Sequence, residues 1–249
     1  GESVDKPLVY YRNNVLSLIN ILEGMAANSI DKLVFSSSCT VYGQPDVLPV
    51  SEKAPIKPPL SPYGNTKQIS EAIIRDVQRK NKIKAQLLRY FNPIGAHESS
   101  KIGELPIGVP QNLIPFVTQT AAGIRKELSV FGDDYPTPDG TAIRDYIHVV
   151  DLARAHISAL RRLMEGKNKS EMEFFNIGTG KGSSVLEVIK AFEKVSQRKL
   201  NYKIVARREG DVISAFADTS LANKELGWKA ALGLEEALAS AWQWQLNQK

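Results

Sequence analysis

The stretch Ser61-Pro62-Tyr63-Gly64-Asn65-Thr66-Lys67 opens a helix that we predict over 63–81, and a strand predicted over 85–91 follows it. Proline is favoured at the first position of a helix, and Ser61 can cap the end that Pro62 begins. Apolar residues then recur at helical spacing, while 85–91 is a short apolar run typical of a buried strand. A helix that leads straight into a buried strand is the repeating unit of a parallel α/β sheet.

The residues before this stretch follow the same order. Apolar side chains over 8–28 lie at helical spacing, and 32–36 form another short apolar run. The proline-rich residues 41–62 indicate a loop. The order helix, strand, loop, helix, strand predicts the α/β class with a doubly wound parallel sheet.

After Gly95 we expect a smaller C-terminal α/β lobe, which begins with a long loop over 96–112. The expected helices are 113–123, 150–165, 184–197, 219–226 and 234–246, and the expected extended segments are 129–131, 144–149, 174–177 and 202–205. Asn112 can cap the first of these helices. No linker divides the chain, so we expect this lobe to pack on the first part.

The composition excludes several classes of protein. The chain has 249 residues, of which 43% are hydrophobic and 24% charged, as in ordinary globular proteins. No apolar run approaches the roughly 20 residues of a membrane span, and we see no signal peptide. A net charge of +5 spread along the chain argues against a nucleic-acid surface. A single cysteine, Cys39, suits a reducing compartment, so we expect a cytoplasmic protein.

Tyr63 and Lys67 can form a proton-transfer pair. They lie four residues apart and therefore share one face of the predicted helix. A phenol with a pKa of about 10 is a poor base at neutral pH, and a nearby ammonium lowers that pKa. The alternative is a surface helix on which the two residues merely coincide. Both predicted strands end in polar residues, Ser36-Ser37-Ser38 and Asn92-Pro93-Ile94-Gly95, where open α/β sheets bind ligands.

One glycine-rich segment, Gly178-Thr179-Gly180-Lys181-Gly182, invites a dinucleotide-binding interpretation, which we reject. Its spacing is not Gly-x-Gly-x-x-Gly, and Arg198 stands where an acidic residue is needed. We predict a tight turn instead, with Ser183 or Ser184 capping the next helix.

The remaining candidates are weaker. The three histidines, His97, His148 and His156, lack the spacing of metal ligands, so we predict structural histidines and no metal site. Arg144 and the segment Arg207-Arg208-Glu209-Gly210-Asp211 place guanidinium groups in loops. Such groups suit diphosphate oxygens, although each could equally form a surface ion pair.

Six ordered motifs together resemble the UDP-glucose 4-epimerases, a family of the extended short-chain dehydrogenase/reductase superfamily. The motifs are Ser36-Ser37-Ser38-Cys39-Thr40-Val41-Tyr42-Gly43, Ser61-Pro62-Tyr63-Gly64-Asn65-Thr66-Lys67, Leu88-Arg89-Tyr90-Phe91-Asn92-Pro93-Ile94-Gly95-Ala96-His97, Asp134-Tyr135-Pro136-Thr137 with Asp139-Gly140-Thr141, Arg144-Asp145-Tyr146-Ile147-His148-Val149 and Arg207-Arg208-Glu209-Gly210-Asp211. The resemblance runs from Gly1 to the C-terminal tryptophans.

The resemblance implies an incomplete Rossmann-like doubly wound parallel sheet with a smaller substrate-binding lobe. Residues 1–95 would be the C-terminal part of an NAD-binding domain, and 96–249 mainly a UDP-sugar-binding lobe, with about 132–165 returning to the first domain. Members of the family carry roughly 85 further residues before the point that matches Gly1, including the glycine-rich phosphate loop. We therefore expect a truncated form that binds NAD poorly and is weakly active or inactive alone.

The resemblance also implies a reaction and its catalytic residues. Tyr63 takes a proton from the sugar 4-hydroxyl while C4 gives hydride to NAD+, Lys67 lowers the pKa of the tyrosine and holds the nicotinamide ribose, and Ser38 bonds the same oxygen. The 4-keto sugar turns over and is reduced on its other face, which converts UDP-glucose to UDP-galactose.

Binding residues are implied in the same way. The cofactor-side residues are Asn14, Ser36, Tyr63, Lys67 and Tyr90. The substrate-side residues are Ser38, Asn92, Asn112, Phe131, Arg144, Arg208, Asp211 and Ala215. Phe131 is expected to face the uracil, the arginines the diphosphate and Asp211 the ribose. The small Ala215 leaves space for an N-acetyl group, so UDP-GlcNAc and UDP-GalNAc are further expected substrates.

Two other functions stay open from the sequence. One is a non-catalytic module that binds a UDP-sugar or a partner, and the other is a sugar-nucleotide 4,6-dehydratase. Cys39 and Thr40 disfavour the dehydratase because such relatives usually carry carboxylates there. The resemblance further implies a homodimer through helices 8–28 and 63–81, with burial of those helices inside one subunit as the alternative. We expect no nucleic-acid partner and no membrane partner.

Overall fold

A computed structural model describes residues 1–208 and 210–248, so Glu209 of the second arginine motif lies outside the described residues. The chain forms two compact units, each built from three separate segments. The first unit comprises 1–90, 154–177 and 218–228, and the second comprises 91–153, 178–217 and 229–249. The α/β class with parallel sheets is confirmed, and each unit is described here by itself.

The first unit is built on a parallel sheet with the strand order β1-β2-β7. Its strands are β1 (Lys32–Ser38), β2 (Lys84–Tyr90) and β7 (Met172–Ile177). In the register of β1 and β2, Ser38 pairs with Tyr90. Because all three strands run in one direction, the polar residues that end β1 and β2 lie at the same edge of the sheet.

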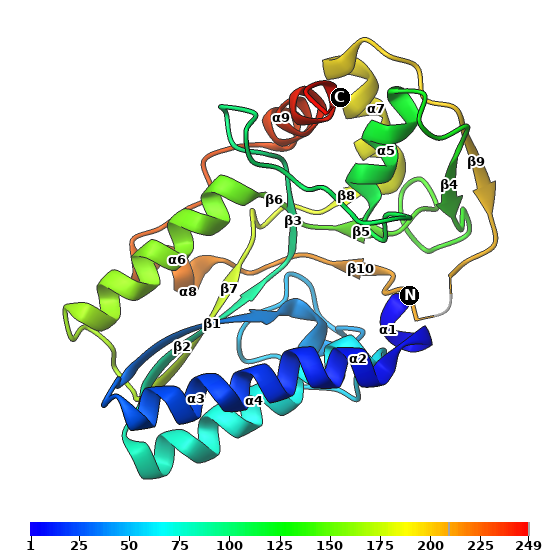
Figure 1. Cartoon of the computed structure of the whole chain (residues 1–249). Coiled ribbons are helices and arrows are strands. Elements are labelled where there is room, and N and C mark those ends of the chain that lie inside the picture. The colour runs from blue at the N-terminus through cyan, green and yellow to red at the C-terminus, as the bar shows by residue number, and fades with distance from the viewer. Residues whose placement is uncertain (209, 249) are drawn as a thin grey trace. The chain divides into compact units, whose positions relative to one another are not determined.

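Helices cover the two faces of this sheet. The N-terminal helical region comprises α1 (Glu2–Asp5), α2 (Pro7–Tyr11), the π-helical turn Arg12–Leu16 and α3 (Ser17–Ala27). It therefore begins earlier than the predicted residue 8. Helices α3 and α4 (Pro62–Asn81) run side by side over one face (Figure 1). Leu18 and Leu22 of α3 pack there with Ile74 of α4 against Leu87 of β2.

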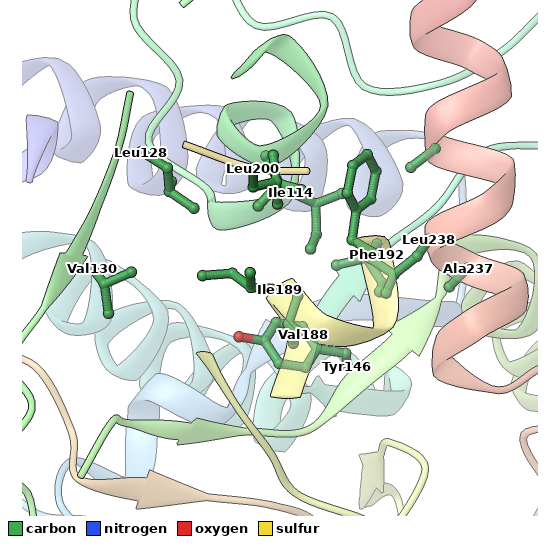
Figure 2. Packing of buried hydrophobic residues seen from close by; sticks show 13 residues of the cluster. Ile114, Leu128, Val130, Tyr146, Val188, Ile189, Phe192, Leu200, Ala237 and Leu238 are labelled. Atoms are coloured by element: carbon green, nitrogen blue, oxygen red, sulfur yellow. The ribbon is translucent and has the colours of Figure 1, made fainter. Parts of the chain in front are cut away.

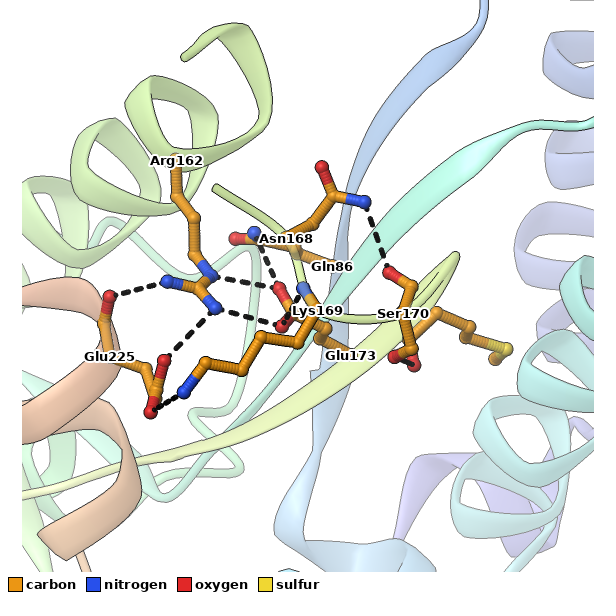
Figure 3. Close-up of polar contacts among 8 residues, drawn as sticks. Gln86, Arg162, Asn168, Lys169, Ser170, Glu173 and Glu225 are labelled. Atoms are coloured by element: carbon orange, nitrogen blue, oxygen red, sulfur yellow. Dashed lines mark hydrogen bonds and ion pairs between the residues drawn. The ribbon is translucent and has the colours of Figure 1, made fainter. Parts of the chain in front are cut away.

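A short 3-10 helix, Cys39–Tyr42, follows β1. Two further helical segments of this unit are α8 (Ser220–Leu226) and the later part of α6 (Val149–Met164). A buried guanidinium joins them to β7. Arg162 of α6 donates to both carboxylate oxygens of Glu173, at 2.9 Å each, and to Glu225 of α8 (Figure 3). Lys169 and Gln86 complete this polar cluster through Glu225 and Glu173. A charge this deeply buried is tolerated because its carboxylate partners surround it.

The second unit contains three small groups of strands. Parallel pairs join β3 (Asn92–Ile94) to β6 (Tyr146–His148) and β4 (Leu128–Phe131) to β9 (Tyr202–Val205). A three-stranded group has the order β10-β5-β8, with β5 at Ile143–Arg144, β8 at Ser183–Ser184 and β10 at Ser214–Ala215. The residues Asn92–Ile94, which the sequence places after the end of a strand, form a short strand of their own that pairs with β6.

Helices α5 (Leu113–Ala121), α7 (Val185–Ser196) and α9 (Leu234–Leu246) enclose the core of this unit. Figure 2 shows Ile114, Phe192 and Leu238, one from each of these helices, meeting in this core. The predicted helices are thus confirmed with ends shifted by a few residues, as is usual where caps and propensity compete.

The glycine-rich segment before α7 is a structural turn, as predicted. Ser184 caps α7 by accepting from the Glu187 amide at 3.1 Å. The turn wraps around the buried carboxylate of Asp145, which accepts from the amides of Thr179 at 2.8 Å and Gly180 at 3.0 Å. A Cβ at Gly178 would lie 2.4 Å from the same carboxylate. These amides therefore serve the protein's own carboxylate rather than a phosphate.

Candidate functional site

Tyr63 and Lys67 lie on the first turns of α4, in the first unit. Pro62 occupies the first helical position, and the Ser61 side chain caps the helix by accepting from the Gly64 amide at 3.2 Å. This cap fixes where α4 begins and hence which residues share a face. Lys67 Nζ lies 5.7 Å from the centroid of the Tyr63 ring, so the structure brings the two predicted residues together.

Lys67 is anchored at the carboxyl end of β1. Its Nζ donates to the carbonyl oxygen of Ser36 at 2.9 Å and lies 5.3 Å from the centroid of the Phe35 ring. Burial lowers the pKa of Lys67. Among the described residues this is its only hydrogen bond, while an ammonium carries three N–H donors. The other two donors suit a pair of neighbouring hydroxyls, such as those of a ribose.

Tyr63 differs from the expectation in one respect. Burial raises the pKa of Tyr63 to about 12, the nearby Tyr90 adds to the rise, and hydrogen bonding with Ser38 lowers the pKa. The expected lowering by Lys67 is therefore not seen in this structure. The physical reason is that burial disfavours the charged phenolate more than any neighbouring group favours it.

Ser38 ends β1 and is buried, with its oxygen held by Thr40. The Thr40 amide donates to Ser38 Oγ at 3.2 Å, and the Thr40 hydroxyl donates to it at 2.9 Å. A serine hydroxyl has two acceptor sites and one hydrogen. Because Thr40 occupies both acceptor sites, the Ser38 hydrogen is free to bond an oxygen such as that of Tyr63. From the sequence, Thr40 serves only to disfavour a dehydratase, because such relatives usually carry a carboxylate at this position.

A second polar group lies beside this pair and includes a residue that sequence reasoning missed. Ser36 Oγ lies 2.9 Å from Nε2 of His156 on α6. The rings of Tyr90 and His156 have centroids 6.3 Å apart. The resemblance predicts Ser36 and Tyr90 on the cofactor side, and the sequence predicts a structural role for His156. The histidine carries no motif of its own, so only its position in the fold reveals it.

Asn14 lies in the π-helical turn Arg12–Leu16. Its side-chain amide donates to Thr66 Oγ1 of α4 at 2.9 Å, between Tyr63 and Lys67 in sequence. Short π-helical turns often occur at functional sites because they redirect a side chain. The structure therefore places Asn14 against the turn that carries the predicted catalytic residues.

A buried ion pair ties α4 to both strands beneath it. Arg89 of β2 donates to Glu71 Oε1 at 2.9 Å and to Oε2 at 2.6 Å, and the Ser37 hydroxyl donates to Oε1 at 2.6 Å. Glu71 follows Lys67 by one helical turn. Since successive side chains of a strand point to opposite faces, Ser37 points to Glu71 of α4 and Ser36 points to the other face. This tie fixes α4 relative to the end of β1.

In the second unit the structure gathers most of the predicted substrate-side residues. Asp211 accepts from Arg208 at 2.7 Å and lies 3.8 Å from Arg144. The Arg208 guanidinium lies 5.5 Å from the centroid of the Phe131 ring, which is exposed at the end of β4. Ala215 of β10 pairs with Arg144 of β5. Two cations, a carboxylate and an exposed aromatic ring form a group suited to a nucleoside diphosphate.

Arg207 is not part of this group, because it donates to Asp134 Oδ1 at 2.6 Å. The backbone N–H of Asn92 donates to the backbone carbonyl of Asp145 at 2.9 Å. Asn112 begins α5 but does not cap it, since its side chain donates to Glu104 at 2.7 Å instead. Asn112 lines a largely apolar cavity of about 460 Å³ with Pro93 and Gly95.

In the part of the chain that the structure describes, no helix combines the length and the apolar character of a membrane span. The histidine, cysteine, aspartate and glutamate side chains of that part form no group of three that could hold a metal ion.

Comparison with known proteins gives consistent matches over almost the whole chain. The family model described as GDP-mannose 4,6 dehydratase matches residues 1–241. A UDP-glucose 4-epimerase of Mus musculus is 54% identical over 246 residues, which cover 98% of this chain and 70% of the relative. This chain is thus shorter than that relative.

Solved structures match equally well. The UDP-glucose 4-epimerase of Bifidobacterium longum in complex with NAD+ and UDP has a TM-score of 0.94 at 48% identity, over 100% of this chain and 73% of that one. The enzyme of Stenotrophomonas maltophila, with bound NAD and formylated UDP-arabinopyranose, has a TM-score of 0.94 at 47% identity, over 99% of this chain and 72% of that one.

Proposed function

This chain belongs to the UDP-glucose 4-epimerase family, and we propose that it carries the residues that interconvert UDP-glucose and UDP-galactose by oxidation and re-reduction at C4 of the sugar, while the 249 residues alone are weakly active or inactive. The observation that carries the proposal is the group formed by Tyr63, Lys67 and Ser38 at the carboxyl end of β1. A phenol, an ammonium and a hydroxyl with its acceptor sites filled can move one proton to and from a substrate oxygen.

The residues of the first unit fit NAD. Lys67 offers two N–H donors to a ribose diol, and Ser36 and Tyr90 supply hydroxyls at the same edge of the sheet. NAD bound by these residues would supply a hydride acceptor for C4 of the sugar and a hydride donor for the later reduction. Asn14 supports this region through Thr66 of α4.

Tyr63 acts as the base and then as the acid. Its phenolate takes the proton of the sugar 4-hydroxyl as C4 loses hydride, which leaves a 4-keto sugar. The same proton returns to the 4-oxygen when C4 is reduced, so no net proton is consumed. Ser38 donates to the 4-oxygen or to Tyr63, because Thr40 fills its acceptor sites. Burial opposes the phenolate, so the base needs a positive charge brought by its ligands.

The residues of the second unit hold the UDP part while the sugar turns. Arg144 and Arg208 face the diphosphate, Phe131 stacks on the uracil and Asp211 bonds the uridine ribose. Asn92 and Asn112 contribute amide groups to the same ligand. The arginines and Asp211 already lie in contact in the structure, so binding exchanges an internal ion pair for one with phosphate.

An assay tests this function in the complete protein, by which we mean the protein at the full length of its relatives. UDP-galactose is supplied, and UDP-glucose is followed by coupling to UDP-glucose dehydrogenase. We expect conversion by the parent protein and a loss of about 10³-fold or more in Tyr63→Phe, which removes the proton-transfer group but keeps the ring. Binding of UDP-glucose without conversion would instead support the non-catalytic binding module.

We also propose that the protein is a cytoplasmic homodimer, formed through the helical regions 8–28 and 63–81. Several apolar side chains of the N-terminal helices are exposed in the first unit, among them Leu8 at 79% and Ile21 at 55%. Contiguous exposed apolar surface on a folded unit marks an association site.

The small residue Ala215 supports a further substrate range, namely UDP-GlcNAc and UDP-GalNAc.

A further inference from the structure

His156 lies beside the catalytic group, and the proposed reaction gives it no role. It lies on α6, where Ala155 and Ala159 are fully buried. His156 itself is half-buried and directs Nε2 to Ser36 Oγ at 2.9 Å. The imidazole of His156 therefore holds the Ser36 hydroxyl on one face of the sheet, while Glu71 holds the Ser37 hydroxyl on the other.

Ser36 is held at more than one atom. His156 holds its hydroxyl, while Lys67 holds its carbonyl at 2.9 Å. Tyr90 lies on the neighbouring strand, with its ring centroid 6.3 Å from that of His156. Hydrogen bonding with Ser36 also lowers the pKa of Tyr90, against the larger rise caused by burial. His156, Ser36 and Tyr90 therefore form a connected polar chain.

We infer that His156 is a positioning residue for the cofactor: it fixes the hydroxyl of Ser36, and through it that of Tyr90, so that both face NAD in one orientation. This inference rests on the proposed function, which assigns Ser36 and Tyr90 to the cofactor. A serine hydroxyl rotates freely unless a partner sets its hydrogen. In either tautomer the ring nitrogen decides which side of Ser36 Oγ carries the hydrogen. Without His156 the Ser36 hydroxyl rotates freely, and NAD binding must then fix its orientation.

The test measures the dissociation constants of NAD and of UDP for the complete protein and its variants. We expect His156→Leu to weaken NAD binding about tenfold, as the loss of one hydrogen bond implies, and to leave UDP binding unchanged. His156→Gln keeps a hydrogen-bonding group and is expected to stay within about threefold of the parent. Ile157→Gln, at an exposed position of the same helix, is the control.

A double-mutant cycle with Ser36→Ala tests whether His156 acts through Ser36. If it does, His156→Leu weakens NAD binding in the parent but adds nothing in Ser36→Ala. Imidazole NMR of the protein without NAD gives an independent readout, because the chain has only three histidines. The His156 signal, identified by its loss in His156→Gln, is expected to shift in Ser36→Ala.

Three results would overturn the inference. They are additive effects in the cycle, an unchanged NAD constant in His156→Leu, and equal losses in His156→Leu and His156→Gln with a lowered melting temperature, which indicates packing alone. If the folded parent binds no NAD, the proposed function fails with it. If the parent binds NAD and His156→Leu binds it equally well, only the role of His156 fails.

Discussion

At the scale of single residues, the decisive feature is the opposition between burial and catalysis at Tyr63. The sequence predicts the pair Tyr63 and Lys67 from helical spacing alone, and the structure brings them together. The direction in which the surroundings shift the pKa of Tyr63 could not be predicted, because it depends on which atoms surround the phenol. Burial raises the pKa of Tyr63 to about 12, so the phenol is neutral at pH 7 in this structure.

The direction of the pKa shift of Tyr63 can be measured directly. In the chain without NAD, we expect Tyr63 to remain protonated to above pH 10, because burial moves its pKa upward from the ordinary value of about 10. The ionisation is followed by NMR of the ring carbon next to the hydroxyl, with the signal assigned by its absence in Tyr63→Phe. Adding NAD is expected to lower the pKa. An ionisation near pH 7 without NAD would contradict this account.

The side chain at residue 215 sets the substrate range. Ala215 lies on β10, in register with Arg144 of the arginine group. Because alanine leaves space beside the sugar, we expect the complete protein to convert UDP-GlcNAc as well as UDP-glucose. Ala215→Tyr is expected to reduce the rate with UDP-GlcNAc at least tenfold, with a small effect on UDP-glucose. Equal losses on both substrates, or no activity of the parent on UDP-GlcNAc, would end this idea.

At the scale of elements, the position of α4 relative to β1 and β2 matters most. The cap at Ser61 and the proline at its first position were predicted from the sequence, since both act locally. The buried pair of Glu71 and Arg89 was not, because a charged residue at either position is ordinary until the strands and the helix meet. The π-helical turn around Asn14 and the short strand β3 were missed for the same reason. All are set by contacts between distant segments.

The tie between α4 and the strands has a measurable effect on stability. Glu71→Ala leaves the buried Arg89 without its carboxylate, which costs roughly 3–5 kcal/mol of unfolding free energy. Urea denaturation of the 249-residue chain gives this value. Glu23→Ala, an exposed glutamate of α3, is the matched control and is expected to change it by less than about 0.5 kcal/mol. Similar losses in both variants would show that the buried pair does not hold α4.

At the scale of the whole molecule, each unit is assembled from three separate segments. Sequence order predicted the α/β class and the main helices and strands, and the resemblance implied that about 132–165 returns to the first domain. The structure groups 154–177 and 218–228 with the first 90 residues. The resemblance located the arginine group and Phe131, which the structure gathers. The assignment of NAD to the first unit and of UDP to the second remains a proposal.

The proposed dimer is tested by charge at the exposed helical surface. We expect Ile21→Glu to convert the protein from dimer to monomer, because a carboxylate at an apolar interface must be desolvated. Light scattering after gel filtration measures the mass. Ile124→Glu, at another exposed apolar position on the second unit, is the control and is expected to stay dimeric. A monomeric parent protein would contradict the proposal.

The most direct test of the central claim follows the hydrogen on C4. UDP-galactose labelled with deuterium at C4 is converted by the complete protein, and the UDP-glucose formed is examined by mass spectrometry and NMR. Because the hydride leaves C4 and returns to it without reaching water, we predict that the deuterium is retained at C4 and that Tyr63→Phe forms almost no product. Exchange of the deuterium for solvent hydrogen, or full activity of Tyr63→Phe, would contradict the account.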